Sequence, residues 1–380
     1  MDFAFTEQQE LIRRTVRDIA QKVVAPRAAE IDRTGEYPWD IKEVLVKQNL
    51  FGLTIPEEYD GFGADLMTVC LVIEELAKVD CSVAGIMVGV VDGIYALSIA
   101  ANEEQKKRYF PKLASGAIGG AIAITEPGAG SDVAAMSTRG VLEGDHYTLN
   151  GVKHFITMGG GVSEIFTVFA ITDPSKGARG ISAFIVEKDY KGFTIGKHED
   201  KMGMRSLPNV ELILEDVSVP VANLLGKEGD GFKIVMQALD RARPGVAAQS
   251  VGLAQGAVDY AIEYSKTRVQ FGQPIGEFQG VQFMLADMAT QVEAARYLTY
   301  KSASLIDQKS KEGPKFAAMA KLFASDTAMR VTTDAVQVLG GYGYIKDHPV
   351  ERMMRDAKLM QLYVGTNQIQ RIIIGRALLS

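Results

Sequence analysis

A glycine-rich segment at residues 121–132 carries the first side chains that could bind a polar ligand. Its sequence, AIAITEPGAGSD, runs from an apolar stretch into a turn that offers Thr125, Ser131 and free main-chain N–H groups. Such a turn suits a phosphate or the polar edge of a ring system. It is not a dinucleotide fingerprint of the G-x-G-x-x-G type, because Val133 stands where the third glycine or alanine belongs. An ordinary turn therefore remains an alternative.

Three further groups of polar residues indicate no particular function when each is considered alone. His154 stands beside an apolar strand, where a histidine is usually structural, and the histidines of the chain show no metal-ligand spacing. Arg268 leaves a predicted helix, where a cation can simply satisfy the helix dipole. Asp240 and Arg243 could equally form a solvated face of a helix.

The C-terminal segment 361–371, QLYVGTNQIQR, lies between a charged predicted helix and an apolar one. It combines a tight Gly365-Thr366 break with several hydrogen-bonding side chains in otherwise apolar surroundings. The residue before the break is Val364, whose side chain cannot accept a proton.

Asp92 is the one acid in a long apolar stretch, residues 83–101. Burying an unpaired carboxylate costs several kcal/mol unless it is paired or its pKa rises. A raised pKa within a pocket suits a general base. The alternative is that Asp92 caps a helix or faces a cationic neighbour.

The composition restricts the classes of function. The chain has 380 residues, 47% of them hydrophobic, which is enough for a large core in one to three domains. The net charge of −6 argues against general nucleic-acid binding. Cys70 and Cys81 exclude a disulfide scaffold and give no metal site. No targeting signal begins the chain and no window has 18 uncharged apolar residues, so we expect a cytoplasmic protein without membrane insertion.

The hydrophobic periodicity changes twice along the chain. Residues 1–118 predict an all-α domain, which begins with a capping box formed by Thr6 and Gln9. Residues 119–228 predict short strands separated by turns, hence a small antiparallel barrel or sandwich. Residues 229–380 predict a helical bundle. The predicted fold class is α+β.

These segments, in this order, resemble the acyl-CoA dehydrogenase family over essentially the whole chain, and most closely its short-chain and butyryl-type members. The pieces that carry the resemblance are residues 124–132 (ITEPGAGSD), 150–157 (NGVKHFIT), Arg268 with Phe271-Gly272, 337–341 (QVLGG), 355–358 (RDAK) and 365–371 (GTNQIQR).

The resemblance implies an N-terminal helical domain, a central antiparallel β-barrel and a C-terminal four-helix bundle, assembled as a homotetramer. It also implies FAD between barrel and bundle, an acyl-CoA thioester substrate and an electron-transferring flavoprotein as acceptor. The residues implied in FAD binding are Ile122, Ile124, Thr125, Gly130, Ser131, Phe155, Ile156, Thr157, Arg268, Phe271, Gln279, Gln337, Gly340, Gly341, Thr366 and Gln368. Those implied in thioester contacts are Ser131, Asp240, Arg243, Val364 and the main chain of Gly365.

One residue that the family's reaction requires is missing. In that reaction a glutamate removes the proton α to the thioester carbonyl while the β hydride passes to the flavin. The glutamate stands directly before the Gly-Thr pair, where this chain has Val364, or in a few members at the position of Ala242. In the family, the helix that matches residues 83–101 lines the acyl pocket. Asp92 is therefore the predicted replacement base.

Three interpretations follow from the missing glutamate. The chain could bind FAD and a thioester without chemistry, or dehydrogenate the α,β bond with another group, or use a relocated base because a different proton is removed. The third favours an α,β-unsaturated substrate, whose α-carbon has no proton and whose acidic proton is the vinylogous γ one. By resemblance to the dehydrogenases of that substrate, we predict 1,4-dehydrogenation of cyclohex-1-ene-1-carboxyl-CoA to cyclohexa-1,5-diene-1-carboxyl-CoA, with Asp92 removing the proton at ring C3.

Overall fold

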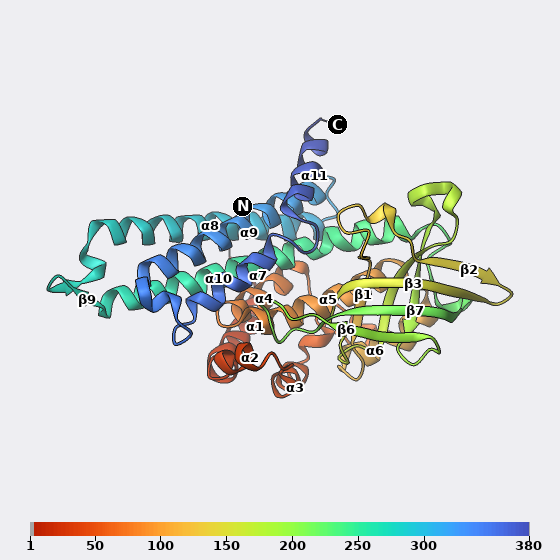
Figure 1. Cartoon of the computed structure of the whole chain (residues 1–380), viewed down its shortest axis with the longest axis horizontal. Helices are drawn as coiled ribbons and strands as arrows, with labels where there is room; N and C mark the ends of the chain where they lie inside the picture. Colours follow the sequence, from red (N-terminus) through yellow and green to blue (C-terminus); the bar gives the residue numbers. More distant parts are fainter. Residues whose placement is uncertain (1–3, 380) are drawn as a thin grey trace.

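The first part of the chain is helical (Figure 1). The computed structural model describes residues 4–379. Its first helices are α1 (Glu7–Ile19), α2 (Ala28–Thr34), α3 (Trp39–Lys47), α4 (Leu66–Ala77), α5 (Cys81–Ala100) and α6 (Glu103–Ala114). Thr6 caps α1, since the Gln9 main-chain N–H donates to Thr6 Oγ1 at 3.2 Å and Thr6 N–H donates to Gln9 Oε1 at 3.1 Å. The predicted capping box is thus confirmed.

An eight-stranded sheet follows the helices. Its strands are β1 (Gly120–Ala123), β2 (Arg139–Glu143), β3 (His146–Thr157), β4 (Ile165–Ile171), β5 (Ile181–Glu187), β6 (Phe193–His198), β7 (Asn209–Pro220) and β8 (Leu224–Leu225). The order is β6-β7-β3-β2-β4-β5-β8, with β1 also paired to β4. Neighbours are antiparallel except that β1 and β2 run parallel to β4, a departure from the antiparallel pattern that the sequence predicted.

The parallel pairing has a simple cause in the chain path. β1 pairs with residues 165–168 of β4, and β2 meets the same strand at Ile171. The two strands therefore occupy successive stretches of one edge, and residues 124–138 between them leave the sheet and return to it. This loop contains most of the glycine-rich segment.

A buried ion pair fixes that loop. Lys153 Nζ donates to Glu126 Oε1 at 2.7 Å, with side chains 0% and 2% exposed. The same carboxylate accepts hydrogen bonds from the main-chain and hydroxyl groups of Ser137 and Thr138. Burial alone would raise the pKa of Glu126, but Lys153 and these hydrogen bonds lower it to about 2. The carboxylate is thus ionised, and the ion pair and hydrogen bonds occupy its oxygens. These interactions hold the loop in one geometry.

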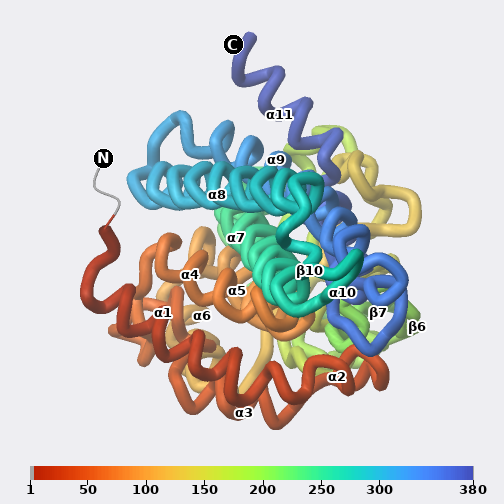
Figure 2. Tube along the Cα trace, turned by 90° about the vertical axis from the view of Figure 1, so that its left-hand side faces the viewer, coloured from red at the N-terminus to blue at the C-terminus, as the bar shows by residue number. Residues whose placement is uncertain are grey.

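Long helices form the last part of the chain. α7 (Gly231–Thr267) packs against α8 (Gln279–Asp307) and α9 (Gly313–Leu339), and α10 (Val350–Met360) lies against α7 and α9. The short strands β9 (Val269–Gln270) and β10 (Gln273–Pro274) join α7 to α8. This ribbon and the large sheet lie at opposite ends of the molecule (Figure 1). α11 (Asn367–Leu379) projects from the body in both views (Figures 1 and 2).

Helix α5 packs against the sheet on one side and the bundle on the other. By length and composition it could cross a membrane, but 78% of its apolar window is buried within this structure. Its N-cap is Asp80, whose side chain accepts from Val83 N–H at 2.9 Å. α5 is therefore best understood as a core helix.

Three glycines with four-residue spacing line one face of α5. An added Cβ would come very close to an atom of the middle part of the chain at each of them: Gly85 (2.5 Å from Met204 Cε), Gly89 (2.5 Å from Met158 Cγ) and Gly93 (2.3 Å from Gly120 O). The sheet can approach the helix backbone closely because these positions lack side chains.

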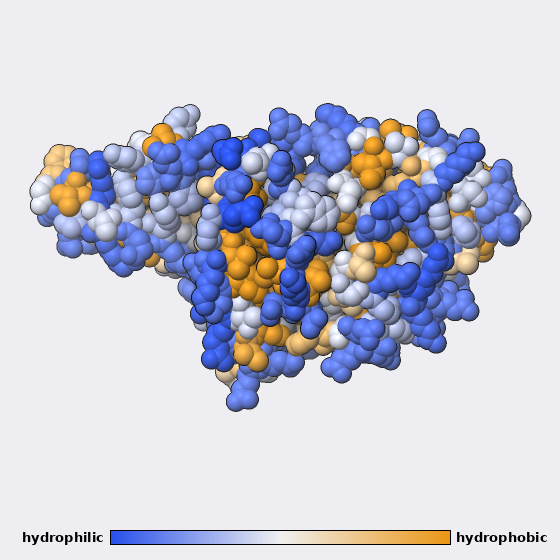
Figure 3. Space-filling model, turned by 90° about the horizontal axis from the view of Figure 1, so that it is seen from below, coloured by the Kyte–Doolittle hydropathy of each residue, from blue (hydrophilic) through white to orange (hydrophobic). Residues whose placement is uncertain are grey.

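Some hydrophobic side chains remain on the surface. From the side on which α2 and α3 lie, a hydrophobic area is visible near the middle of the molecule (Figure 3). Elsewhere, Phe271 is 95% exposed, Tyr344 86% and Leu379 91%. Exposed apolar groups of this size mark candidate contact surfaces when they gather in patches.

The contact between α5 and β1 can be tested with Gly93→Ala. We expect the variant to lose about 1–3 kcal/mol of stability, because the new methyl group would collide with a main-chain oxygen of β1. Gly375→Ala in α11 is the matched control, since no heavy atom lies within 4 Å of its added Cβ. Thermal unfolding followed by circular dichroism compares them, and equal melting temperatures would contradict the close approach.

Candidate active site

Asp92 lies near the middle of α5, and its carboxylate forms no ion pair within residues 4–379. The side chain is partly accessible, but its Oδ1 is buried and has no hydrogen-bond partner among residues 4–379. Burial alone raises the pKa of Asp92 from 3.8 to about 8. The helix cap is Asp80 instead. The alternative of a cap or an ion pair therefore does not hold for Asp92.

Two phenols, those of buried Tyr95 and half-buried Tyr363, lie within the electrostatic reach of Asp92. Burial first, and then the Asp92 carboxylate, raises the pKa of Tyr95, which follows Asp92 by one helical turn. Burial first, then Cys81 and Asp92, raises the pKa of Tyr363. Tyr363 directly precedes Val364, so Asp92 is close to the C-terminal turn from which the usual glutamate is missing.

Asp92 is also near the segments predicted to line the flavin. Its neighbour Gly93 packs against the start of β1, and Gly89 packs against the residue that follows β3. β1 leads into residues 122–131, and β3 contains residues 155–157. The fold thus gathers the candidate base, both predicted flavin segments and the C-terminal turn around one helix.

The end of β3 presents an aromatic ring and a hydroxyl to accessible space. Phe155 is 58% exposed at φ 57°, an uncommon conformation for a bulky residue, and stacks on His154 with ring centroids 4.1 Å apart. Asn209 Nδ2 donates to Thr157 Oγ1 at 3.1 Å, which leaves the Thr157 hydroxyl proton for a ligand. Ile156 between them is buried. A ring face and a donor side by side fit the polar edge of a flavin.

The loop after β1 is similarly open. Ile122, Ile124 and Thr125 are partly exposed, and Gly130 and Ser131 are exposed. No heavy atom lies within 4 Å of a Cβ added at Gly130. A ligand can therefore approach the main chain of this turn.

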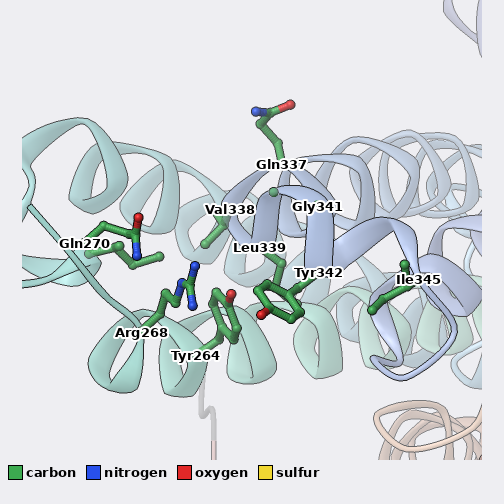
Figure 4. Close-up of a pocket in the computed structure, with 11 residues that line it drawn as sticks. Tyr264, Arg268, Gln270, Gln337, Val338, Leu339, Gly341, Tyr342 and Ile345 are labelled. Atoms are coloured by element: carbon green, nitrogen blue, oxygen red, sulfur yellow. The ribbon is translucent and has the colours of Figure 1, made fainter.

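Arg268 and Gly341 lie together at the far end of the bundle (Figure 4), and Gly340 lines the same site. They line a hollow of about 400 Å³. Arg268 lies over the Tyr342 ring at 5.1 Å from its centroid. In Figure 4 the Gln337 side chain points away from Arg268.

Two other predicted cofactor residues, Phe271 and Gln279, are exposed and do not line this hollow. Arg268 directly precedes β9, and β9 and the large sheet lie at opposite ends of the molecule (Figure 1). A cofactor lying against the sheet could therefore meet Arg268 only across a contact between two copies of the chain.

The turn before α11 is strained. Val364 has φ 53° and Gly365 has φ 85°. A β-branched residue rarely adopts the left-handed region, so the surroundings must hold it there. Thr366 caps α11 by accepting from Ile369 N–H at 3.3 Å, and Gln368 is exposed. Within residues 4–379, the N–H groups of residues 364–366 have no acceptor, so they are available to a ligand.

Asp240 and Arg243 bind each other rather than solvent. They form an ion pair in which the Arg243 side chain is 3% exposed, so the solvated-face alternative fails for Arg243. The Arg243 Nε has no partner among the described residues. Ala242, the alternative position for the family's glutamate, is buried between them.

The sequence did not single out two polar residues that support the C-terminal turn. Lys321 is fully buried, and its Nζ donates to Gly365 O. Gln249 is also fully buried and accepts from the Tyr363 hydroxyl. A lone lysine in the alanine-rich run 317–325, AAMAKLFAS, was the available signal for Lys321. Over residues 4–379, no three His, Cys, Asp or Glu side chains cluster as metal ligands.

Comparison with known proteins gives one consistent family. The acyl-CoA dehydrogenase N-terminal, middle and C-terminal domain descriptions match residues 6–117, 121–217 and 229–379. Cyclohex-1-ene-1-carbonyl-CoA dehydrogenase of Syntrophus aciditrophicus is 49% identical over 98% of this chain and 90% of that protein. Short-chain-specific acyl-CoA dehydrogenase of Clostridium acetobutylicum is 48% identical over 99% of each. Butyryl-CoA dehydrogenase from Megasphaera elsdenii superposes with a TM-score of 0.97, 45% identity and full coverage of both chains.

The site and the comparisons agree. The exposed Phe155 ring, the free Thr157 hydroxyl proton and the open Gly130 turn fit a flavin, and the matches span all parts of the chain. The chain therefore belongs to the acyl-CoA dehydrogenase family and is an FAD-dependent oxidoreductase.

Proposed function

We propose that this protein catalyses the 1,4-dehydrogenation of cyclohex-1-ene-1-carboxyl-CoA to cyclohexa-1,5-diene-1-carboxyl-CoA, with Asp92 as the base. One observation carries the proposal. A valine occupies the position of the family's glutamate, while a partly accessible carboxylate with a pKa of about 8, whose Oδ1 is buried without a partner among the described residues, lies near the same turn. Two relatives named cyclohex-1-ene-1-carbonyl-CoA dehydrogenase, each 49% identical, support the choice of substrate.

The choice of substrate explains why Val364 is tolerated. In an α,β-unsaturated thioester the α-carbon has no proton, so a carboxylate at position 364 would have nothing to remove. The acidic proton lies at ring C3, and ionised Asp92 accepts it. FAD held by the residues around Phe155, Thr157 and Gly130 would supply the acceptor for the hydride from ring C6. These two losses convert the cyclohexene to the conjugated diene.

The chain's own groups must also polarise the thioester carbonyl, since the developing charge is delocalised onto its oxygen. The main-chain N–H groups of Val364, Gly365 and Thr366 are the donors we assign to this task. Main-chain donors do not depend on the side chain at position 364. The replacement of glutamate by valine therefore removes the carboxylate and leaves the polarising groups in place.

The assembly and partners are part of the same proposal. We expect a cytoplasmic homotetramer that transfers electrons to an electron-transferring flavoprotein. The exposed Phe271 near the Arg268 hollow, and the exposed end of α11, offer apolar surface for contacts between copies. Such contacts would bring Arg268 of one copy to the cofactor of another.

Two alternatives remain distinguishable. The similarity to short-chain acyl-CoA dehydrogenases favours ordinary α,β-dehydrogenation of a short or alicyclic acyl-CoA as the second candidate. A redox-inactive scaffold that binds FAD and acyl-CoA is the third. Anaerobic mixing with candidate thioesters separates them by the visible absorbance of the flavin. Bleaching by the cyclohexenoyl thioester supports the proposal, bleaching by saturated thioesters alone supports the second candidate, and spectral shifts without bleaching support the scaffold.

Asp92→Asn tests the base directly. We expect turnover of the cyclohexenoyl thioester to fall by about 10²–10⁴-fold, because the amide cannot accept the proton. FAD content should be unchanged. Ser98→Ala, at an exposed position of the same helix, is the control and should keep full activity. A largely active Asp92→Asn enzyme would rule Asp92 out as the base.

The raised pKa of Asp92 has consequences for pH. Turnover requires the ionised form, so kcat/KM should rise with pH up to about 8. Stability should change in the opposite direction. Between pH 4 and 8 the unfolded chain loses this proton while the folded protein keeps it, so stability falls as pH rises.

The matched comparison for stability is again Asp92→Asn. It should be more stable than the parent at pH 8, with an advantage that shrinks as the pH falls and is gone below pH 4. Urea unfolding across this range measures the difference. A pH-independent difference would mean that Asp92 is not buried in its neutral form.

Val364→Glu restores the family's carboxylate. We expect it to gain activity on saturated acyl-CoA thioesters such as butyryl-CoA, because the α-proton of these substrates then has an acceptor. The longer unbranched side chain also suits φ 53° better than valine does. Steady-state rates on butyryl-CoA are the measurement. If no rate appears, the shape of the acyl pocket, rather than the missing base, excludes saturated substrates.

A further inference from the structure

The strained conformation of Val364 requires an explanation in the surrounding structure. A β-branched residue at φ 53° costs about 1–3 kcal/mol relative to an ordinary conformation. The next residue, Gly365, also has a positive φ, of 85°. Such a turn persists only where its main-chain groups are held by other parts of the fold.

Two buried side chains hold this turn by its carbonyl oxygens. Lys321 Nζ, from α9, donates to Gly365 O at 2.9 Å and to Asn367 Oδ1 at 2.9 Å. Gln370 Nε2, from α11, donates to Gly365 O at 2.9 Å and to Val364 O at 3.2 Å. Both side chains are fully buried. Two successive carbonyl groups are therefore gathered toward the same pair of donors.

The direction of the N–H groups follows from this arrangement. In a trans peptide the carbonyl and the N–H of the same unit point in opposite directions, and there are no cis peptide bonds among residues 4–379. The Val364 and Gly365 carbonyls share peptide units with the N–H groups of Gly365 and Thr366. Those N–H groups must then point away from Lys321 and Gln370. They have no acceptor in the described part of the chain.

Lys321 is an unusual residue for a purely structural role. No carboxylate in the described range forms an ion pair with it, and its oxygen partners are a main-chain carbonyl and an amide. Burial chiefly, and then the positive charge of Arg243, lowers the pKa of Lys321 to about 7. Burying an ammonium group in this way is costly compared with an apolar side chain. The buried Lys321 ammonium group lies directly under the turn, which indicates that its role is to hold the turn in place.

We propose that Lys321, together with Gln370, is a positioning residue that holds the turn at residues 364–366 so that its main-chain N–H groups point at the thioester carbonyl. The inference rests on the proposed function only in that a thioester is the ligand. It does not depend on which residue is the base. Lys321 holds the donors from behind and does not touch the substrate.

Lys321→Met tests the proposal by removing the ammonium while keeping most of the volume. On the cyclohexenoyl thioester, kcat should fall by about 10²-fold, because misplaced donors stabilise the transition state less. KM and FAD content should change little. Lys315→Met is the matched control, because Lys315 lies in the first turn of the same helix, less than two turns before Lys321, and pairs with Glu312. It should behave like the parent.

A spectroscopic measurement separates positioning from general damage. In Asp92→Asn protein the bound thioester is not turned over, so infrared spectroscopy with a ¹³C-labelled carbonyl can report its hydrogen bonds. Adding Lys321→Met should move the carbonyl stretch back toward its frequency in water, whereas adding Lys315→Met should not. Butyryl-CoA as a second probe gives the same readout whatever the true substrate, so this result is independent of the Asp92 proposal.

Two outcomes would overturn the inference. One is an unchanged carbonyl frequency in the Lys321→Met protein. The other is a loss of activity explained wholly by lost FAD, since the donors would then serve the cofactor. If Lys321→Met does not fold, Gln370→Met removes the second clamp on the same carbonyls and is subject to the same two criteria.

Discussion

The close contact between helix α5 and the sheet determines where the chemistry can occur. Gly85, Gly89 and Gly93 leave one face of the helix without side chains, and the sheet fills that space. The rest of the helix packs mainly against α4 and α7. Asp92 directly precedes Gly93, so the contact of Gly93 with β1 keeps Asp92 near the predicted flavin segment that β1 leads into. The packing of α5 against the sheet therefore determines the position of the Asp92 carboxylate, independently of its reactivity.

Four ionisable groups in or near the core show three different ways of satisfying a charge. Glu126 and Lys153 neutralise each other, and hydrogen bonds complete the carboxylate. Lys321 has only neutral oxygen partners. Asp92 has an oxygen with no partner at all, so burial favours its protonated form. The first arrangement stabilises a loop in one geometry, and the last leaves a group ready to exchange a proton. This contrast is why Asp92, and not the paired and more deeply buried Glu126, is the candidate base.

The local features of the fold could be predicted from the sequence, and the long-range pairings could not. Hydrophobic periodicity and the Thr6 capping box depend on neighbours within a few residues, and the structure confirms the capping box. The lone acid in an apolar run likewise identified Asp92 as buried. The parallel placement of β1 and β2 on β4 was not predicted, because it depends on a loop that leaves the sheet and returns to the same edge. Lys321 was missed for a similar reason, since its partner carbonyl lies 44 residues later in the chain.

In the proposed site, one set of groups polarises the thioester carbonyl and a separate group removes the proton. This separation explains how an enzyme of this family could change the proton it removes. Every thioester has the same carbonyl, so the groups that polarise it can stay fixed while substrates change. In this chain the groups that we propose for this role are main-chain N–H donors. Their carbonyl sides are held by Lys321 and Gln370, so their positions do not depend on the side chain at position 364. The base has the opposite requirement, because it must lie where the acidic proton is. A carboxylate on α5 and a valine in the turn are compatible with both requirements.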